Sequence, residues 1–433
     1  MNDTVKPVTP QNLATTTSWF RTAAPYIHSH RGATFVIAFD GETIDSQEFE
    51  PLLHDISILN SLGIKLVLVY GARPQIEASC IEQNIPVRYH NGLRVTDDIS
   101  LVIAKAAIGK LRLDIESKLS FGLPHTPMAD ARIRCISGNL VIARPAGIID
   151  GVDLGHTGEV RRIDAEGINQ QLGLGNIVLL PPLGYSLTGE SFNVSAESIA
   201  TEVATALRAD KLIFIGHSNK TMPRELTVNE AEKTLSSHPS LHAAVKACKA
   251  GVTRVHILDR AINGVLLQEL FSRDGAGTLV TSTSFETTRQ ATIDDVGGIL
   301  ELIQPLEEKG VVVKRSRELL EREIDHFTVM ERDGSVVACA ALYPYPDNDM
   351  AELACLAVSN QYQSHGRGQQ LLGVLEQSAK AQGINNLCVL TTQTAHWFLE
   401  HGFKPAEIAD LPVAKQALYN YQRKSRVFRK ELD

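Results

Sequence analysis

The stretch 351–372 constrains the fold more than any other part of the sequence. It runs AELACLAVSNQYQSHGRGQQLL: an apolar strand over 353–358 leads into a polar turn with Gly366 and Gly368, and an amphipathic helix begins at once. A helix that starts directly after a strand presents backbone N–H groups without intrahelical partners, and the helix dipole adds partial positive charge there. We therefore predict a site for a pyrophosphate group at this turn.

The order of residues in the turn distinguishes several glycine-rich phosphate loops. The dinucleotide fingerprint and the Walker loop need a spacing or a Lys-Ser/Thr pair that is missing here. The turn consists of Gln363, Ser364, His365, Gly366, Arg367 and Gly368. It resembles the Gln/Arg-x-x-Gly-x-Gly/Ala loop of the GNAT acetyltransferases, which implies that these residues bind acetyl-CoA. An ordinary strand–turn–helix connection is the alternative for the pattern alone.

Length and composition bound the class of protein. The chain has 433 residues, of which 43% are hydrophobic and 21% charged, as in globular proteins of two or three domains. We find no apolar run of about 18 residues and no signal-peptide core, so we expect a cytoplasmic protein without membrane contact. A net charge of −8 without a long basic run argues against nucleic-acid binding. Six scattered cysteines without a CxxC pair predict buried, reduced thiols, and we expect no metal.

The N-terminal segment has two predicted parts. Residues 1–17 are expected to be disordered, and 19–27 to form a short helix broken by Pro25. The aromatic residues of this helix have no apolar partner nearby in sequence. The helix therefore either caps its own domain or docks on a neighbouring subunit.

Two α/β domains are predicted. Continuous Val/Ile/Leu strands alternate with amphipathic helices over 18–280, which indicates a parallel sheet covered on both faces. The polar stretch 281–290 lacks periodicity and predicts a linker. The second domain, 291–433, has the order helix, helix, hairpin around Asp333 and Gly334, strand, pyrophosphate turn, helix, strand, helix, strand. This is the GNAT order, so that resemblance covers the whole domain.

The first domain resembles the amino acid kinase family, and within it N-acetylglutamate kinase. The resemblance is carried by TFVIAFDG, VYGARPQI, GLRVTD, HTGEV and FNVSAESIA. The chain differs from these kinases at the positions that carry their chemistry. Ala38 replaces the lysine of the first strand, 70–73 replaces the glycine-rich loop, and Glu197 replaces the catalytic aspartate. Phosphoryl transfer depends on positioning and charge neutralisation. We therefore expect a kinase fold that is catalytically inactive and binds a ligand instead.

Four residues of this domain resemble the arginine site of arginine-inhibited N-acetylglutamate kinases. They are Tyr26 in the N-terminal helix, Glu269 in a later helix, and Gly275 and Gly277 in the turn that follows. A carboxylate and turn carbonyls suit a guanidinium group, and a tyrosine ring can pack on the aliphatic stem. A capped helix followed by a glycine turn is the alternative.

Acetyl transfer to an amine needs a base, because a free α-amino group is protonated at pH values below its pKa of about 8. Glu352 opens the central strand, and strand alternation places it on the same face as Ala354, Leu356 and Val358. It lies about 20 Å before the end of that strand, close to the reach of a pantetheine arm. We predict that Glu352 is the base, acting through water. A solvent-exposed carboxylate at the strand end is the alternative.

A hydroxyl group on the neighbouring strand could return a proton to the CoA thiolate. Thr391 and Thr392 both stand at the end of NLCVLTT, and the family resemblance favours Thr391. In GNAT enzymes the two central strands splay apart. The resemblance implies that the backbone of Leu356, Ala357 and Val358 pairs with the pantetheine amides.

Basic residues could hold the carboxylates of an acidic acceptor. Arg315 in KRSRE and Arg423 in YNYQRKSRVF resemble the glutamate-binding residues of the bacterial N-acetylglutamate synthase family, which shares this order of domains. The resemblance implies an acetyl-CoA:L-glutamate N-acetyltransferase that catalyses the first step of arginine biosynthesis, is inhibited by L-arginine, and forms a homo-oligomer such as a hexamer. The alternatives are an active N-acetylglutamate kinase with an accessory domain, and a non-enzymatic sensor of arginine and CoA.

Overall fold

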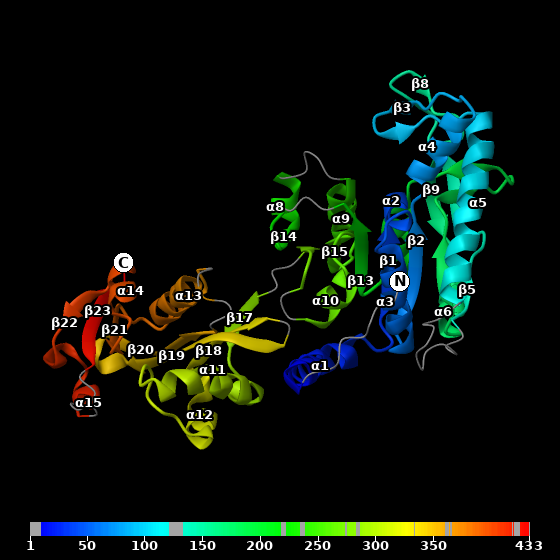
Figure 1. The fold of residues 1–433 in the computed structure, drawn as a ribbon. Coiled ribbons are helices and arrows are strands. Elements are labelled where there is room, and N and C mark those ends of the chain that lie inside the picture. Colours follow the sequence, from blue (N-terminus) through cyan, green and yellow to red (C-terminus); the bar gives the residue numbers. More distant parts are fainter. Residues whose placement is uncertain are drawn as a thin grey trace. The chain divides into compact units, whose positions relative to one another are not determined.

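The computed structural model describes residues 10–120, 133–217, 222–233, 239–272, 275–282, 286–332, 334–359, 363, 366–417, 419 and 425–432. The chain divides into two compact units, Met1–Thr283 and Ser284–Asp433 (Figure 1). Each unit has its own sheets and hydrophobic core, and each is described by itself.

The first unit is built on a large, mostly parallel sheet. In spatial order its strands are β14 (Glu225–Thr227), β16 (Thr278–Thr281), β15 (Arg254–Asp259), β13 (Lys211–Gly216), β1 (Thr34–Phe39), β2 (Lys65–Tyr70), β10 (Ile177–Leu180) and β5 (Cys135–Ile136). Every pair is parallel except β15 with β16. A smaller sheet consists of β12 (Ser191–Asn193), β11 (Leu183–Tyr185), β6 (Val141–Pro145) and β9 (Gly158–Ile163). Two short hairpins pair β3 (Tyr89–His90) with β4 (Leu93–Arg94) and β7 (Ile148–Ile149) with β8 (Val152–Asp153).

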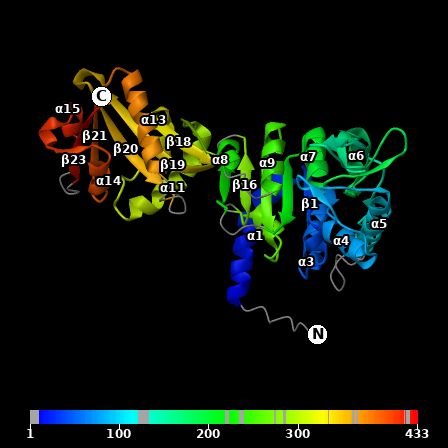
Figure 2. The same ribbon diagram turned by 90° about the horizontal axis from the view of Figure 1, so that it is seen from above.

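Helices cover both faces of the large sheet, as predicted (Figures 1 and 2). The helices of this unit are α1 (Pro10–His30), α2 (Gly41–Ile44), α3 (Phe49–Ser61), α4 (Arg73–Glu82), α5 (Asp98–Ser120), α6 (Ala165–Gly173), α7 (Ala196–Leu207), α8 (Val228–Lys233), α9 (Pro239–Lys249) and α10 (Val265–Phe271). Alternate residues of β1 enter the two cores: Phe35, Ile37 and Phe39 pack with α3, α5 and α10, whereas Val36 and Ala38 pack with α7 and α9.

The helix α1 is longer than the sequence predicts. It begins at Pro10, inside the segment expected to be disordered, and it continues through Pro25 to His30. Tertiary contacts stabilise its last turns: the side chain of Ala23 is fully buried, and His30 Nε2 lies 3.0 Å from the carbonyl oxygen of Leu270. The helix therefore packs on α10 of its own unit, and the expectation of a break at Pro25 is wrong.

The second unit contains one seven-stranded sheet. In spatial order its strands are β17 (Glu286–Gln290), β18 (Phe327–Arg332), β19 (Ser335–Tyr345), β20 (Met350–Val358), β21 (Asn386–Thr391), β23 (Arg426–Glu431) and β22 (Lys404–Ala406). Its helices are α11 (Val296–Glu308), α12 (Arg317–Glu323), α13 (Arg367–Ala381), α14 (Ala395–Glu400) and α15 (Val413–Gln416). In Figure 1, α13 and α14 lie on one face of the sheet, and α11, α12 and α15 lie on the other. The predicted hairpin is present between β18 and β19, with Gly334 at a φ of +75°.

The strand β17 occupies part of the predicted linker. Residues 286–290 form an antiparallel edge strand against β18, so the expectation of a linker extending to residue 290 is wrong. The strand is fixed by side chains rather than by apolar burial: Arg289 contacts Asp295 at 2.7 Å and Glu331 at 2.6 Å. An edge strand with polar residues on both faces carries no hydrophobic alternation, which is why its sequence resembles a linker.

Candidate active site

The strand β20 carries the predicted base and ends before the predicted pyrophosphate turn. A β-bulge interrupts it: Ala341 pairs with Ala354, but Cys339 pairs with Ala357, so β20 has one residue more than its partner. Cys355 lies in this bulge and has a φ of +54°. A bulge shifts the side chains that follow it to the other face of the sheet.

The bulge corrects the predicted face of Glu352. Leu356 and Val358 pack in the core beneath α13, together with Leu353, so they share a face with Leu353 rather than with Glu352. Glu352 points to the opposite face, which α11, α12 and α15 cover. The prediction that Glu352 shares its face with Leu356 and Val358 is therefore wrong, because uninterrupted alternation was assumed.

Glu352 is buried and paired. Its side chain is 8% exposed, and Oε1 lies 2.8 Å from Nζ of Lys415 in α15. Cys388 stands beside it in the register of β21. Burial, followed by the charge of Glu352, raises the pKa of Tyr345 to about 12. The alternative of a solvent-exposed carboxylate at the strand end is thus wrong.

The two central strands separate just beyond Glu352. In the described residues the parallel ladder between β20 and β21 ends at the pair Leu353–Val389, although β20 continues to Val358 and β21 to Thr391. This is the splay that the resemblance implies. It leaves the side of β20 that faces β21 without a strand partner over 354–358, where Leu356, Ala357 and Val358 could pair with another amide chain.

The predicted pyrophosphate turn leads into α13. Gly366 is the N-cap at a φ of +72°, a conformation that favours glycine. A Cβ atom on Gly368 would lie 3.2 Å from Cζ2 of Trp397, so a side chain at this position would require the Trp397 ring to shift slightly. Ser364 and His365 lie outside the described residues, and Gln363 Nε2 donates to the carbonyl oxygen of Val358 at 3.3 Å.

The side chain of Arg367 contacts a residue of the protein itself. It is buried, and its Nε donates to Oε1 of Glu286 in β17 at 2.7 Å. Arg332 lies 3.5 Å from the same carboxylate oxygen. The guanidinium of Arg367 therefore connects α13 to the edge strand, and its contribution to a phosphate site would come from its backbone N–H at the helix start.

Arg315 lies on the same face of the sheet as Glu352. Its guanidinium neighbours the hydroxyl of Tyr343, and Tyr343 is paired directly with Glu352 across β19 and β20. Burial alone would lower the pKa of Arg315. The neighbouring acidic groups of Cys355, Tyr343 and Glu323 outweigh burial, so the pKa of Arg315 is raised. The structure thus brings together a predicted substrate residue and the predicted base. Arg423 lies outside the described residues.

The two candidate hydroxyl groups face different ways. Thr391 follows Leu387 and Val389, which pack beneath α13, and its Oγ1 lies 2.7 Å from Oγ1 of Thr394. Thr392 Oγ1 donates to the carbonyl oxygen of Gly310, after α11, at 3.4 Å. Thr391 is therefore on the face of α13, whereas Thr392 lies on the face of Glu352.

Three of the predicted effector residues, Glu269, Gly275 and Gly277, meet in the first unit. Glu269 is buried in α10, and its carboxylate accepts from the backbone of Ala276 at 2.5 Å and of Gly277 at 2.8 Å. His256 Nδ1, 2.6 Å away, donates to the other oxygen, since a carboxylate only accepts. Burial would raise the pKa of Glu269. The hydrogen bond from His256, the charge of His256 and the hydrogen bonds from the two backbone amides outweigh burial and lower this pKa to about 2. Tyr26 packs on the same apolar cluster as Ala276.

The glycines of the turn are required by close approach to the carboxylate and to β15. A Cβ atom on Gly275, whose φ is +60°, would lie 2.6 Å from Oε2 of Glu269. One on Gly277 would lie 2.6 Å from the carbonyl oxygen of Ile257. The glycine turn of the alternative interpretation is therefore present, and the carboxylate closes it.

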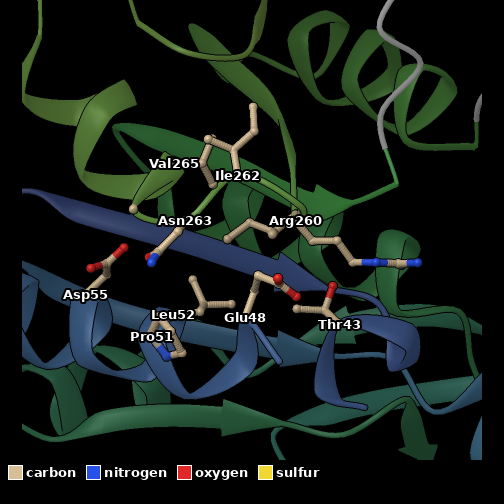
Figure 3. Close-up of a pocket in the computed structure, with 11 residues that line it drawn as sticks. Thr43, Glu48, Pro51, Leu52, Asp55, Arg260, Ile262, Asn263 and Val265 are labelled. Carbon is tan, nitrogen blue, oxygen red and sulfur yellow. The ribbon is translucent and has the colours of Figure 1, made fainter. Parts of the chain in front are cut away.

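A small cavity of about 10 Å³ lies in the first unit between α3 and the connection from β15 to α10 (Figure 3). Asp55 and Asn263 line it from the two sides, and burial raises the pKa of Asp55 to about 6. A volume of this size holds at most one water molecule, so the cavity is no site for a nucleotide. Ala38, at the position of the missing kinase lysine, is buried in β1 and packs in the core on the other face of the sheet.

Sequence reasoning missed two polar residues of these sites. Lys415 belongs to a four-residue helix that has no periodicity, so no sequence signal marks it. His256 interrupts the apolar strand RVHILD, and a polar residue at the centre of a buried strand is a signal that could have been used. The described residues contain no cluster of His, Cys, Asp or Glu that could hold a metal. None of the helices described is long and apolar enough to span a membrane.

Known proteins resemble this chain over nearly its full length. The amino acid kinase family matches residues 33–259, and the acetyltransferase (GNAT) family matches residues 298–403. Amino-acid acetyltransferases from Azotobacter vinelandii and Pseudomonas fluorescens are 51% and 50% identical to it, covering 96% of this chain and 99% of each relative. A crystal structure of N-acetylglutamate synthase from Neisseria gonorrhoeae, complexed with coenzyme A and L-arginine, has a TM-score of 0.87 and 38% identity over 96% of this chain and 99% of that chain.

These similarities agree with the architecture found here. They confirm the predicted fold, a kinase-like parallel sheet unit followed by a GNAT unit, and the predicted acetyltransferase activity. The chain belongs to the family of amino-acid acetyltransferases in which an amino acid kinase domain precedes a GNAT domain.

Proposed function

We propose that the chain transfers the acetyl group of acetyl-CoA to the α-amino group of L-glutamate, giving N-acetyl-L-glutamate and CoA. The observation that carries this proposal is the position of Glu352: a buried carboxylate next to the gap between β20 and β21, with Arg315 on the same face. A further structure of the Neisseria gonorrhoeae relative, at 38% identity and a TM-score of 0.60, is described as a complex with coenzyme A and N-acetyl-glutamate.

In the proposed reaction the amine attacks the thioester directly. Glu352 takes a proton from the α-ammonium group, through a water molecule, and the free amine forms a bond to the thioester carbon. Backbone N–H groups of 356–358 stabilise the oxyanion and hold the pantetheine arm. The C–S bond then breaks, the CoA thiolate leaves with the electron pair, and the nitrogen gives up its second proton, which reaches the thiolate by way of the Thr391 hydroxyl. Gly366, Arg367 and Gly368 bind the pyrophosphate through their backbone, because α13 starts there.

Arg315 and Arg423 are proposed to bind the carboxylates of glutamate. A guanidinium group forms two parallel hydrogen bonds to a carboxylate, which fixes its orientation as well as its charge. Arg315 supports this role by its position: it lies beside Tyr343, the direct neighbour of Glu352 in β19. An acidic acceptor held there would have its amine next to the base.

We expect Thr391→Val to lower kcat by about tenfold, if the Thr391 hydroxyl protonates the departing thiolate. The effect is modest because a thiolate leaves readily without protonation. Thr392→Val is the matched control and should leave kcat unchanged in the same steady-state assay. The opposite pattern would assign the proton donor to Thr392, which lies on the face of Glu352.

We also propose that the enzyme catalyses the first step of arginine biosynthesis and is inhibited by L-arginine bound near Tyr26, Glu269, Gly275 and Gly277. The Neisseria gonorrhoeae relative is described as complexed with L-arginine. Beside the turn, His256 Nε2 is buried and has no hydrogen-bond partner among the described residues. Burial lowers the pKa of His256, so at neutral pH the ring is neutral, donates from Nδ1 and leaves Nε2 as an acceptor, which suits a guanidinium N–H.

Domain roles, compartment and assembly complete the proposal. We assign a regulatory role to 18–280 and the catalytic role to 291–433, in a cytoplasmic homo-oligomer. The six free cysteines suit a reducing compartment. Trp19 and Phe20 of α1 are 46% and 59% exposed, which suits contact with another subunit.

The central test is release of the CoA thiol from acetyl-CoA, measured with a panel of amino acids in the presence and absence of arginine. We expect release with glutamate and a lower rate when arginine is added. Release with lysine or an aminoglycoside, but not with glutamate, would refute the substrate. An unchanged rate with arginine would refute the proposed feedback inhibition alone.

A further inference from the structure

The ion pair between Glu352 and Lys415 links the proposed base to a separate segment of the chain. Lys415 Nζ lies 2.8 Å from Glu352 Oε1, and the two side chains are 22% and 8% exposed. Lys415 comes from α15, in the segment between β22 and β23. Two long side chains in water gain little by pairing, but here both are largely removed from solvent, so the contact is not an ordinary surface pair.

The segment that carries Lys415 is fixed in place. Leu411 precedes α15 and is buried in a cluster with Met350 and Cys388, directly beside Glu352. Gln416, the residue after Lys415, donates from Nε2 to the carbonyl oxygen of Leu411 at 2.7 Å. The ammonium group is thus presented to the carboxylate by packed structure, not by a free loop.

The other groups around Glu352 do not replace the ammonium. From β19, Tyr345 provides a hydroxyl whose pKa burial and the carboxylate raise to about 12. From β21, Cys388 has a pKa that burial and the same carboxylate raise to about 12. From β23, Arg429 donates to Asn386 Oδ1 at 2.8 Å instead. Among the residues that the structure describes, Lys415 is therefore the cation in direct contact with this carboxylate.

We infer that Lys415 is a positioning residue for acetyl transfer, whose ammonium group holds the Glu352 carboxylate in place and aimed toward the acceptor amine. The inference rests on the proposed role of Glu352 as base. During the step, the proton of the substrate ammonium passes to Glu352 through water, and Lys415 keeps its own proton.

The experiment compares full-length variants in the thiol-release assay with glutamate. Lys415→Met is expected to lower kcat/KM at neutral pH by about tenfold, and to move the acidic limb of its pH profile upward, because the positive charge beside the carboxylate is removed. Lys415→Arg keeps the charge and should restore most of the rate and the original limb. KM for acetyl-CoA should stay nearly unchanged, because α15 lies on the face of the sheet opposite α13, the helix that begins at the pyrophosphate turn.

Lys430→Met is the matched control, since Lys430 is as buried as Lys415 and pairs with Glu376, 2.6 Å away, on α13. It removes a similar ion pair and should leave the pH profile unmoved. If Lys415→Met does not fold, Lys415→Gln takes its place in the comparison. A Lys415 variant that folds and keeps the wild-type acidic limb overturns the inference.

The variant Glu352→Gln separates this inference from the proposed function. If Glu352→Gln keeps only a small residual rate and Lys415→Met does not lower that residual rate further, the two residues act as one unit, as inferred. If Glu352→Gln keeps full activity, the base assignment fails and the inference fails with it. If Glu352→Gln loses most of its rate but Lys415→Met in the wild-type background behaves like Lys430→Met, only the inference fails.

Discussion

Replacing Glu352 by glutamine is expected to lower kcat for glutamate acetylation by about 10²- to 10³-fold, the usual contribution of a general base. Glutamine has nearly the same shape but cannot accept the proton of the α-ammonium group. KM for acetyl-CoA should change little, because the pyrophosphate turn lies at the other end of β20, about 20 Å from residue 352. Steady-state thiol release at saturating acetyl-CoA measures both quantities.

The pH dependence of this variant provides a second readout. Above the pKa of the free α-amino group, the substrate loses its proton without help, so the remaining rate of Glu352→Gln should rise with pH and approach that of the wild type. Glu376→Gln is the control: Glu376 also pairs with a lysine, Lys430, but on α13. A Glu352→Gln enzyme with wild-type kcat at neutral pH would contradict the assignment of the base.

Local patterns in the sequence predicted the elements that carry this chemistry. The apolar run of β20, the glycines at 366 and 368 and the amphipathic pattern of α13 all lie within 351–372, and the structure has each element there. The parallel sheet of the first unit was predictable for the same reason. Strands buried on both faces are continuous Val/Ile/Leu runs, and β1, β2, β10 and β13 are such runs.

Contacts between distant residues could not be predicted in this way. The guanidinium of Arg367 binds Glu286, which is 81 residues away in sequence. Lys415 reaches Glu352 from a helix too short for a hydrophobic pattern. Each pair depends on how strands are ordered in the sheet, and the sequence of one segment carries no information about the segment that will lie beside it.

The bulge at Cys355 shows a third kind of limit. Period-two alternation assigns the side chains of a strand to two faces only while the strand is regular. One extra residue at Cys355 moved Leu356 and Val358 to the face opposite Glu352. Cys355 is not a glycine, so the residue type did not mark the left-handed backbone that the bulge requires.

Replacing Glu269 by leucine is expected to destabilise the first unit by about 3–5 kcal/mol, the largest stability effect predicted for this chain. The carboxylate accepts from His256 and from the amides of Ala276 and Gly277, and all three donors are left without it. Urea unfolding of the full chain, followed by circular dichroism, measures the loss. Glu202→Leu is the control, because Glu202 forms an exposed pair with Lys246 and should cost at most about 1 kcal/mol.

The sign of the pH dependence follows from the lowered pKa of Glu269. Its pKa falls from 4.5 to about 2 on folding, so the carboxylate stabilises the folded state fully above about pH 4.5, and this contribution is lost as the pH falls toward 2. A shift of this size corresponds to roughly 3 kcal/mol. The difference in unfolding free energy between wild type and Glu269→Gln should therefore narrow as the pH falls from 4.5 toward 2.

A difference that is independent of pH, or an unfolding free energy of Glu269→Leu equal to that of Glu202→Leu, would show that the carboxylate does not hold the turn. Measuring the arginine inhibition of Glu269→Gln then separates two roles of the carboxylate. If the carboxylate only closes this turn, the variant is still inhibited by arginine. If it also binds the effector, the variant loses this inhibition.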